Sequence, residues 1–341
     1  MHSLGATCFR AVRFSTKRCR GQRCMLASSA SGEPRASATA SGKDDDTHFG
    51  FQQARDLTTS VPLERKKGMV KGVFSSVAHN YDVMNDLMSA GKKKKSGAWM
   101  HRLWKDEFVK MLGISTGWDA GSPPPKVLDV AGGTGDIAFR MADELRPYMF
   151  GEGGASGEFE GDGVEEASDV PLLTVSDINP DMLEASTFKS SDRFSGETLD
   201  SMRFMQADAE ALPFEDNSFH LYTIAFGLRN VTDMDKALRE AHRVLRPGGR
   251  FMCLEFSRVP IEPLQKAYDW YSFNVIPTIG QVVAQDREAY QYLVESIRMF
   301  PGQEELEGRM RSAGFKMVSH SNLTAGVVAV HSGFKMPARA L

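Results

Sequence analysis

Cysteine is scarce in this sequence, and long apolar runs are absent. Three of the four cysteines are Cys8, Cys19 and Cys24, which leaves Cys253 alone in the rest of the chain. A lone cysteine forms no internal disulfide, and no cysteine spacing suggests zinc, so we expect no metal site. No stretch approaches the roughly 18 consecutive apolar residues of a membrane-spanning helix. Any membrane contact is therefore expected to be peripheral.

Acidic residues are nearly missing from residues 1–43. This segment holds eight Lys or Arg against the single acid Glu33, with many Ser and Ala. Such a composition is typical of an organellar transit peptide, with a disordered basic tail that binds nucleic acid as the alternative. A secretory signal fits worse, because no apolar core follows the charges. We therefore predict a transit peptide over 1–43 and a polar linker over 44–72.

Basic excess is absent from the remainder of the chain. The segment 1–43 carries a net charge of +7 and the whole chain −3, which leaves −10 beyond residue 43. Without a basic surface, nucleic acid is not expected as a substrate. Residues 151–170 hold seven acids, six glycines and no base. Such a segment cannot bury enough apolar surface to order itself, so we predict a disordered acidic insertion.

Apolar runs alternate with helical patterns beyond residue 73. The predicted strands cover 126–130, 172–178, 203–207, 219–226, 250–256, 315–323 and 326–334, and the clearest helical patterns cover 73–90, 100–112, 136–147 and 233–246. Alternation of this kind predicts an α/β fold with a mainly parallel sheet. The last two runs are joined too closely for a crossover helix, so they should form an antiparallel hairpin. We predict one Rossmann-like domain over 73–341 with a seven-stranded sheet.

A glycine-rich loop follows the first predicted strand. It contains Gly132, Gly133, Thr134 and Gly135 and comes directly after Asp129. Open α/β sheets bind ligands at the carboxyl ends of their strands, and glycine lets a ligand approach the backbone. Two classes of cofactor bind at such a loop. One is S-adenosylmethionine, and the other is a nicotinamide dinucleotide, whose pattern the spacing Gly-x-Gly-x-x-Ala also satisfies.

Acidic residues also end the next two predicted strands. Asp177 ends the second strand, where a carboxylate can accept both hydroxyls of a ribose in either class of cofactor. The third ends in Gln206-Ala-Asp-Ala-Glu210, and the apolar and acidic run that follows is typical of methyltransferases. We expect Asp208 to bind the adenine amino group and the Ala209 backbone to face the ring. The alternative for Asp208 is a helix N-cap.

Several longer blocks point to one family. They are Phe74-Ser-Ser-Val-Ala, Tyr81-Asp-Val-Met-Asn-Asp-Leu-Met-Ser89, His101-Arg-Leu-Trp-Lys105, Val127-Leu-Asp-Val-Ala-Gly-Gly-Thr-Gly-Asp136, Ala225-Phe-Gly-Leu-Arg-Asn-Val231 and Arg243-Val-Leu-Arg-Pro-Gly-Gly249. Together they resemble the UbiE-type ubiquinone and menaquinone C-methyltransferases from about Val73 to Lys335. The resemblance implies the class I methyltransferase fold with S-adenosylmethionine as cofactor. It also implies cofactor contacts at Thr134, Asp177, Asp208 and Ala209.

The implied reaction is C-methylation of the ring of 2-methoxy-6-polyprenyl-1,4-benzoquinol in ubiquinone biosynthesis. Alternatives are a demethylmenaquinol methyltransferase, a nicotinamide-dependent oxidoreductase and a cofactor-binding scaffold without catalysis. By the resemblance, Arg229 and Asn230 face the quinol with Tyr81 nearby. We expect Arg229 to stabilise the phenolate, because a guanidinium cannot readily act as a base. Alternatively, Arg229 pairs with a carboxylate such as Asp208 and merely holds the loop.

Other residues could also accept the proton. His79, His101 and Glu255 are rival proton acceptors. The aromatic-rich helical stretch 262–298 is either core packing or a lid over the apolar tail of the substrate. The resemblance implies a mitochondrial protein on the matrix side of the inner membrane, associated with other ubiquinone-biosynthesis proteins, and a homodimer is compatible with it.

Two departures from the family stand out. Ala225 replaces a serine common in bacterial members, and about eight extra residues, including Lys92 to Lys95, follow Gly91.

Overall fold

The computed structural model describes residues 100–114, 125–150, 172–283 and 287–337. Several sequence predictions lie outside the described residues: the transit peptide 1–43, the linker 44–72, the helix 73–90 with His79 and Tyr81, the Lys92 to Lys95 patch and the acidic insertion 151–170.

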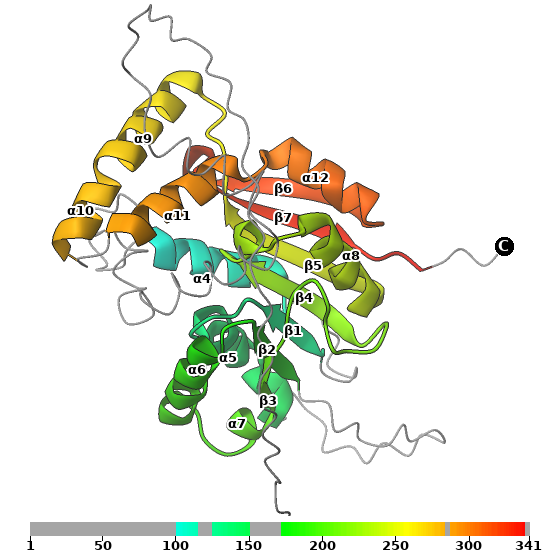
Figure 1. Ribbon diagram of the computed structural model, residues 1–341. Coiled ribbons are helices and arrows are strands. Elements are labelled where there is room, and N and C mark those ends of the chain that lie inside the picture. The colour runs from blue at the N-terminus through cyan, green and yellow to red at the C-terminus, as the bar shows by residue number, and fades with distance from the viewer. Residues whose placement is uncertain (1–99, 115–124, 151–171, 284–286, 338–341) are drawn as a thin grey trace, which may run out of the picture. The chain divides into compact units, whose positions relative to one another are not determined.

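A single seven-stranded sheet organises these residues (Figure 1). Its strands are β1 (Val127–Val130), β2 (Leu173–Asp177), β3 (Met202–Gln206), β4 (Phe219–Ala225), β5 (Leu245–Phe256), β6 (Lys316–Leu323) and β7 (Val328–Phe334), in the order β3-β2-β1-β4-β5-β7-β6. Strands β1 to β5 pair in parallel, whereas β7 runs antiparallel to β5 and to β6. The predicted mainly parallel sheet and the C-terminal antiparallel hairpin are confirmed.

Helices cover both faces of the sheet (Figure 1). Before and between the first three strands lie α4 (Met100–Leu112), α5 (Asp136–Phe150), α6 (Pro180–Arg193) and the short α7 (Glu197–Asp200). Later in the chain come η2 (Leu228–Asn230), α8 (Met234–Val244), α9 (Glu262–Asn274), α10 (Ile276–Val283), α11 (Arg287–Met299), α12 (Gln303–Ser312) and η3 (Thr324–Gly326). Local chemistry fixes the starts of some of these helices. In α6, for example, the Asn179 side chain accepts the Asp181 backbone N–H and Pro180 stands at the first position.

The central strand β1 is buried along its whole length, which explains why its sequence is an almost continuous apolar run. Because side chains alternate across a strand, Val127 faces one layer and Leu128 the other. Val127 belongs to a core built with α4, α5 and α11. Leu128 belongs to a second core built with α8 and α12.

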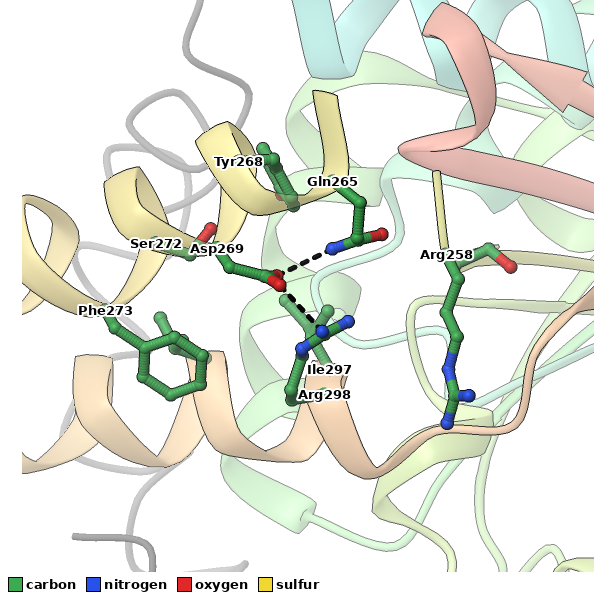
Figure 2. A pocket seen from close by; sticks show the side chains of 10 residues that line it. Arg258, Gln265, Tyr268, Asp269, Ser272, Phe273, Ile297 and Arg298 are labelled. Carbon is green, nitrogen blue, oxygen red and sulfur yellow. Dashed lines mark hydrogen bonds and ion pairs between the residues drawn. The ribbon is translucent and has the colours of Figure 1, made fainter. Parts of the chain in front are cut away.

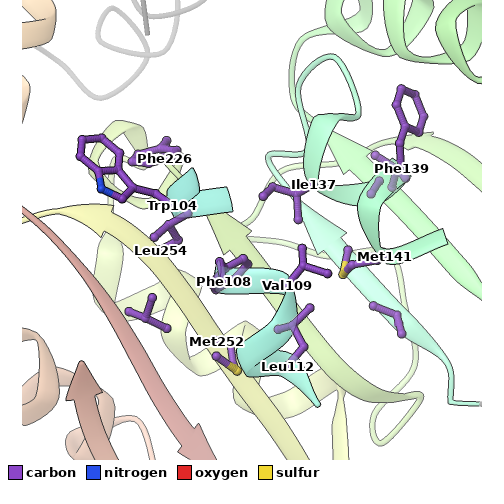
Figure 3. Close-up of a cluster of buried hydrophobic side chains, with 14 of the residues drawn as sticks. Trp104, Phe108, Val109, Leu112, Ile137, Phe139, Met141, Phe226, Met252 and Leu254 are labelled. Atoms are coloured by element: carbon purple, nitrogen blue, oxygen red, sulfur yellow. The ribbon is translucent and has the colours of Figure 1, made fainter. Parts of the chain in front are cut away.

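Figure 3 shows the first of these cores, where α4 packs on the sheet. Phe108 is fully buried, and the Trp104 ring meets the Phe256 ring edge-on at 6.0 Å. An ion pair of 2.7 Å between Nζ of the buried Lys105 and Oδ2 of the partly exposed Asp136 joins α4 to the first turn of α5. Helix α4 is thereby held beside the loop that follows β1.

The predicted helix 233–246 ends earlier than expected, at Val244, and the fifth strand begins at Leu245 instead of 250. Arg246 precedes Pro247, and a residue before proline is disfavoured in helical geometry. The helix therefore ends before Arg246, and Leu245 is already extended and pairs with Phe219. The register then shifts between Phe219 and Leu221.

Within the predicted helical stretch 262–298, the described residues form α9, α10 and α11. Figure 2 shows how α9 and α11 are joined. Asp269 Oδ1 accepts a hydrogen bond from Gln265 at 2.6 Å, and Asp269 Oδ2 forms an ion pair with Arg298 at 2.7 Å. Within the described ranges, no helix is long and apolar enough to cross a bilayer.

Truncating Phe108 tests the importance of the α4 contact. Phe108→Ala should lower the free energy of unfolding by about 3 to 5 kcal/mol, because a fully buried ring leaves a cavity. The matched control is Phe188→Ala, since Phe188 is 76% exposed and should change stability by about 0.5 kcal/mol or less. Urea unfolding of both variants measures the difference. Similar losses in the two variants would contradict the assigned packing.

Candidate active site at the carboxyl ends of the parallel strands

The chain changes direction across the sheet between β1 and β4, which is the topological switch point where open α/β sheets bind ligands. The loops after these two strands touch there. Ala131 and Phe226, the residues that directly follow β1 and β4, have positive φ angles of 53° and 54°. A β-carbon built on Gly227 would lie only 2.5 Å from the Ala131 β-carbon. Backbone strain of this kind gathers at functional sites.

Asp129 lies buried below this contact. Its Oδ1 accepts the Thr223 hydroxyl at 2.7 Å, whereas its Oδ2 has no partner among the described residues. Burial raises the pKa of Asp129 from 3.8 to about 7; the Thr223 hydrogen bond opposes this rise and nearby Asp177 adds to it. A buried carboxylate oxygen without a donor is costly, so this atom is suited to receive a donor or cation from a ligand.

Asp177 fixes the glycine-rich loop. Its Oδ2 accepts the Gly133 backbone N–H at 2.9 Å, and its Oδ1 accepts the Asn179 N–H at 2.8 Å. Burial raises the pKa of Asp177, against the effect of these backbone donors. Each carboxylate oxygen can accept more than one hydrogen bond, so both oxygens keep capacity for ribose hydroxyls.

The glycine-rich loop itself is open where a ligand would approach. Gly133 has a φ of +56°, and a β-carbon there would meet nothing within 4 Å. Gly135 has a φ of +85°, and a β-carbon there would lie 2.5 Å from the Phe139 ring and from Ser186 Oγ. A side chain is therefore excluded at Gly135 by packing. Thr134 is buried, and it lines a surface cavity together with His101.

Asp208 does not cap a helix. Its Oδ1 accepts the Glu210 backbone N–H at 3.0 Å, and its carbonyl accepts the Ala211 N–H, so it closes a tight turn in which Ala209 is buried. The N-cap alternative is thus wrong, because no helix follows β3. The turn is tethered by Glu210, whose Oε1 accepts the Thr232 and Asp233 backbone N–H groups just beyond η2.

Arg229 on η2 forms a buried ion pair with Glu255 at the end of β5. Both side chains are 1% exposed, and Nη1 lies 2.8 Å from Glu255 Oε1 and donates also to the Phe226 carbonyl. Arg229 Nε is buried and has no acceptor among the described residues. Burial raises the pKa of Glu255, and the Arg229 charge opposes that rise. The carboxylate partner of Arg229 is therefore Glu255 and not Asp208.

Asn230, the next residue, is held from the helical segment. Tyr292 on α11 donates its hydroxyl to Asn230 Oδ1 at 3.3 Å. The structure thus brings Asp129, Gly133 and Asp177 to the same edge of the sheet as Arg229 and Asn230 of η2, as the sequence predicts.

Sequence reasoning missed Thr223, Glu210 and Tyr292, because their roles depend on contacts across the fold. Among the residues that the structure describes, no group of three His, Cys, Asp or Glu side chains could hold a metal ion.

The raised pKa of Asp129 makes a prediction about stability. Between about pH 4 and about pH 7 the folded state holds a proton that the unfolded state has released. The free energy of unfolding therefore falls as the pH rises through this range, and the loss is complete once the pH has passed about 7. Asp129→Asn keeps an acceptor for Thr223 and removes the titration. Relative to this variant, the wild type should lose roughly 1 to 3 kcal/mol of unfolding free energy between about pH 5 and about pH 8. Urea unfolding at both pH values measures this difference. An equal change in unfolding free energy in the two proteins would contradict the raised pKa of Asp129.

Solved structures of S-adenosylmethionine-dependent methyltransferases are among those to which this chain is similar. One from Thermotoga maritima has a TM-score of 0.46 at 18% identity and covers 78% of this chain and 99% of its own. A phosphoethanolamine N-methyltransferase from Haemonchus contortus, solved with S-adenosyl-L-methionine, has a TM-score of 0.43 at 14% identity over 68% of this chain and 53% of its own.

Sequence relatives are much more similar. The mitochondrial 2-methoxy-6-polyprenyl-1,4-benzoquinol methylase of Dictyostelium discoideum is 46% identical over 87% of this chain and 89% of its own length. The ubiquinone/menaquinone biosynthesis C-methyltransferase UbiE of Dinoroseobacter shibae is 47% identical over 86% and 98%. The model of the ubiE/COQ5 methyltransferase family matches residues 62–335. This chain therefore belongs to the ubiE/COQ5 methyltransferase family.

Proposed function

We propose that this S-adenosylmethionine-dependent C-methyltransferase methylates the ring of 2-methoxy-6-polyprenyl-1,4-benzoquinol in ubiquinone biosynthesis. The names of the eukaryotic relatives support this substrate. The structural observation that carries the proposal is the contact between Gly227 and Ala131. It puts Arg229 and Asn230, the residues proposed to face the quinol, directly beside the loop proposed to hold the methyl donor.

The residues at the crevice fit S-adenosylmethionine. Gly133 leaves its backbone open, and the orphaned Asp129 Oδ2 is suited to a cationic or N–H group. The residues that would hold the cofactor are Asp129, Gly133, Thr134, Gly135, Asp177, Asp208 and Ala209. When bound, the cofactor supplies an electrophilic methyl group on a sulfonium.

The remaining chemical task is to favour the phenolate form of the quinol, which makes the ring carbon nucleophilic. A free phenol has a pKa of about 10, by analogy with tyrosine, so the site must stabilise the anion or remove the proton. Arg229 offers fixed donors and cannot readily accept a proton, so we assign it to stabilise the oxyanion while the proton leaves through water. Asn230 is assigned as a second contact to the quinol, with Tyr81 nearby.

The rival bases differ in how well they fit. Glu255 fits poorly, because its oxygens accept from Arg229 and from the Phe256 backbone N–H. His101 is buried on α4 and shares a cavity with Thr134, which belongs to the cofactor side of the crevice. With water as the proton acceptor, none of His79, His101 and Glu255 is needed as a base.

A direct assay separates benzoquinol from naphthoquinol substrates. Demethylmenaquinol is the alternative, because the bacterial relatives carry names for both pathways. Purified protein with S-adenosylmethionine should add one methyl to a short-chain analogue of the benzoquinol, detected by mass, and should act more slowly on demethylmenaquinol. Preference for the naphthoquinol would overturn the proposed substrate.

We further propose a mitochondrial location on the matrix side of the inner membrane, reached through the transit peptide 1–43. The mitochondrial names of relatives from Dictyostelium, Xenopus, Drosophila and Bos support the organelle. Peripheral membrane contact follows from the polyprenyl tail of the substrate, which stays in lipid. The helices α9 to α11 are then assigned as a lid over that tail, and other ubiquinone-biosynthesis proteins or a second copy of the chain as partners.

Arg229 provides the test of the catalytic assignment. Arg229→Met alone would leave Glu255 buried and unpaired, which costs roughly 3 to 5 kcal/mol of stability. The double variant Arg229→Met with Glu255→Gln removes both charges and keeps one acceptor oxygen for the Phe256 backbone N–H. It should fold, bind S-adenosylmethionine normally and lose about 10²-fold in kcat, as expected for removal of an oxyanion donor.

Arg229→Lys serves as the matched control. It keeps the charge beside Glu255 but loses the planar donor fork, so it should retain only part of the rate. Normal turnover in the stably folded double variant would end the catalytic assignment.

A further inference from the structure

Tyr292 connects the helical segment to the proposed quinol site. It lies on α11, whose neighbouring side chains Tyr290, Leu293 and Val294 are buried in the core. Its hydroxyl reaches Asn230 Oδ1 at 3.3 Å and makes no other side-chain hydrogen bond within the described part of the chain. Hydrogen bonds of catalytic sites are often long without substrate and tighten when it binds. Through this hydrogen bond, α11 contacts the side chain of Asn230 on η2.

The contact determines which way the Asn230 amide points. An asparagine side chain has one acceptor oxygen and one NH₂ donor, and a hydroxyl that donates to the oxygen turns the NH₂ group away from it. Burial raises the pKa of Tyr292, against the effect of the Arg229 charge, so the hydroxyl keeps its proton at neutral pH. With Tyr292 as donor, Asn230 offers its NH₂ group to a ligand.

This orientation matches the chemistry of the adjacent residue. Arg229 carries only donors, and its Nε lacks an acceptor among the described residues. An amide turned the other way would present a lone-pair oxygen to a phenolate, and the two would repel. The two neighbouring residues of η2 together provide donors alone.

We propose that Tyr292 is a positioning residue for methyl transfer, which holds the Asn230 amide with its NH₂ group toward the quinol oxygen. The inference rests on the proposed function. It also makes the rate sensitive to the placement of α11, because the helix sets the amide through the tyrosine hydroxyl.

The test is Tyr292→Phe, which removes the hydroxyl and keeps the ring. We expect kcat for the benzoquinol analogue to fall about 3- to 10-fold, the size of one net hydrogen bond. The melting temperature and the Kd for S-adenosylmethionine should stay within error. The matched control is Tyr222→Phe, which removes a hydroxyl from a buried tyrosine of β4 in the core built with α8 and α12 and should leave kcat unchanged.

A double-mutant cycle with Asn230→Ala separates positioning from general stability. If Tyr292 acts through the amide, Tyr292→Phe should have no further effect on kcat once the amide is gone. The same fold loss in both backgrounds would overturn the inference. So would unchanged kcat in Tyr292→Phe, or a loss of rate that comes with lower melting temperature and weaker cofactor binding.

The activity of the wild-type protein separates a failure of the proposed function from a failure of the role assigned to Tyr292. Wild-type protein that methylates neither quinol would remove the proposed function and, with it, this inference. Wild-type protein that methylates the benzoquinol while Tyr292→Phe is equally fast would remove the inference alone.

Discussion

The close approach of Gly227 to Ala131 is the constraint on which the site depends. Adjacent parallel strands β1 and β4 end side by side, and their exit loops must turn apart without a gap. Both loops do so through left-handed residues, Ala131 and Phe226, at an energetic cost that the surrounding packing must offset. Any side chain at Gly227 would push the loops apart. The distance between the glycine-rich loop after β1 and η2 is therefore set by the backbone.

The buried pair of Arg229 and Glu255 contributes orientation more than stability. Two charges lose their hydration in such a pair, and the attraction between them often only balances that loss. The geometry is nevertheless well satisfied, because Glu255 also accepts the Phe256 backbone N–H and Arg229 donates to the Phe226 carbonyl. A guanidinium held this way cannot rotate toward solvent. A preorganised donor of this kind loses little reorganisation energy when charge develops on a substrate.

The sequence was sufficient for the sheet and for the position of the candidate residues at the ends of its strands, because both are encoded locally. The apolar run at Val127–Val130, the glycines behind it and the acid at Asp177 all act within a few residues of one another. The partner of Arg229 was not encoded in this way. Glu255 is 26 positions away and meets Arg229 only because β5 lies beside β4. Asp208, the acid suggested as that partner, is occupied with the turn after β3, and Tyr292 reaches Asn230 across 62 positions.

The site is divided chemically along the line where the two loops meet. Carboxylates gather on the side of β1, β2 and β3, at Asp129, Asp177 and Asp208, whereas the η2 side offers the donors of Arg229 and Asn230. S-adenosylmethionine carries a sulfonium, an ammonium and ribose hydroxyls, which all suit acceptors. A phenolate suits donors. With the roles proposed above, the acceptor side would favour S-adenosylmethionine and the donor side would favour the phenolate, because opposite charges attract more strongly away from water. The same division would oppose binding of the quinol on the acceptor side, so that the ring carbon would meet the methyl group where the two loops touch.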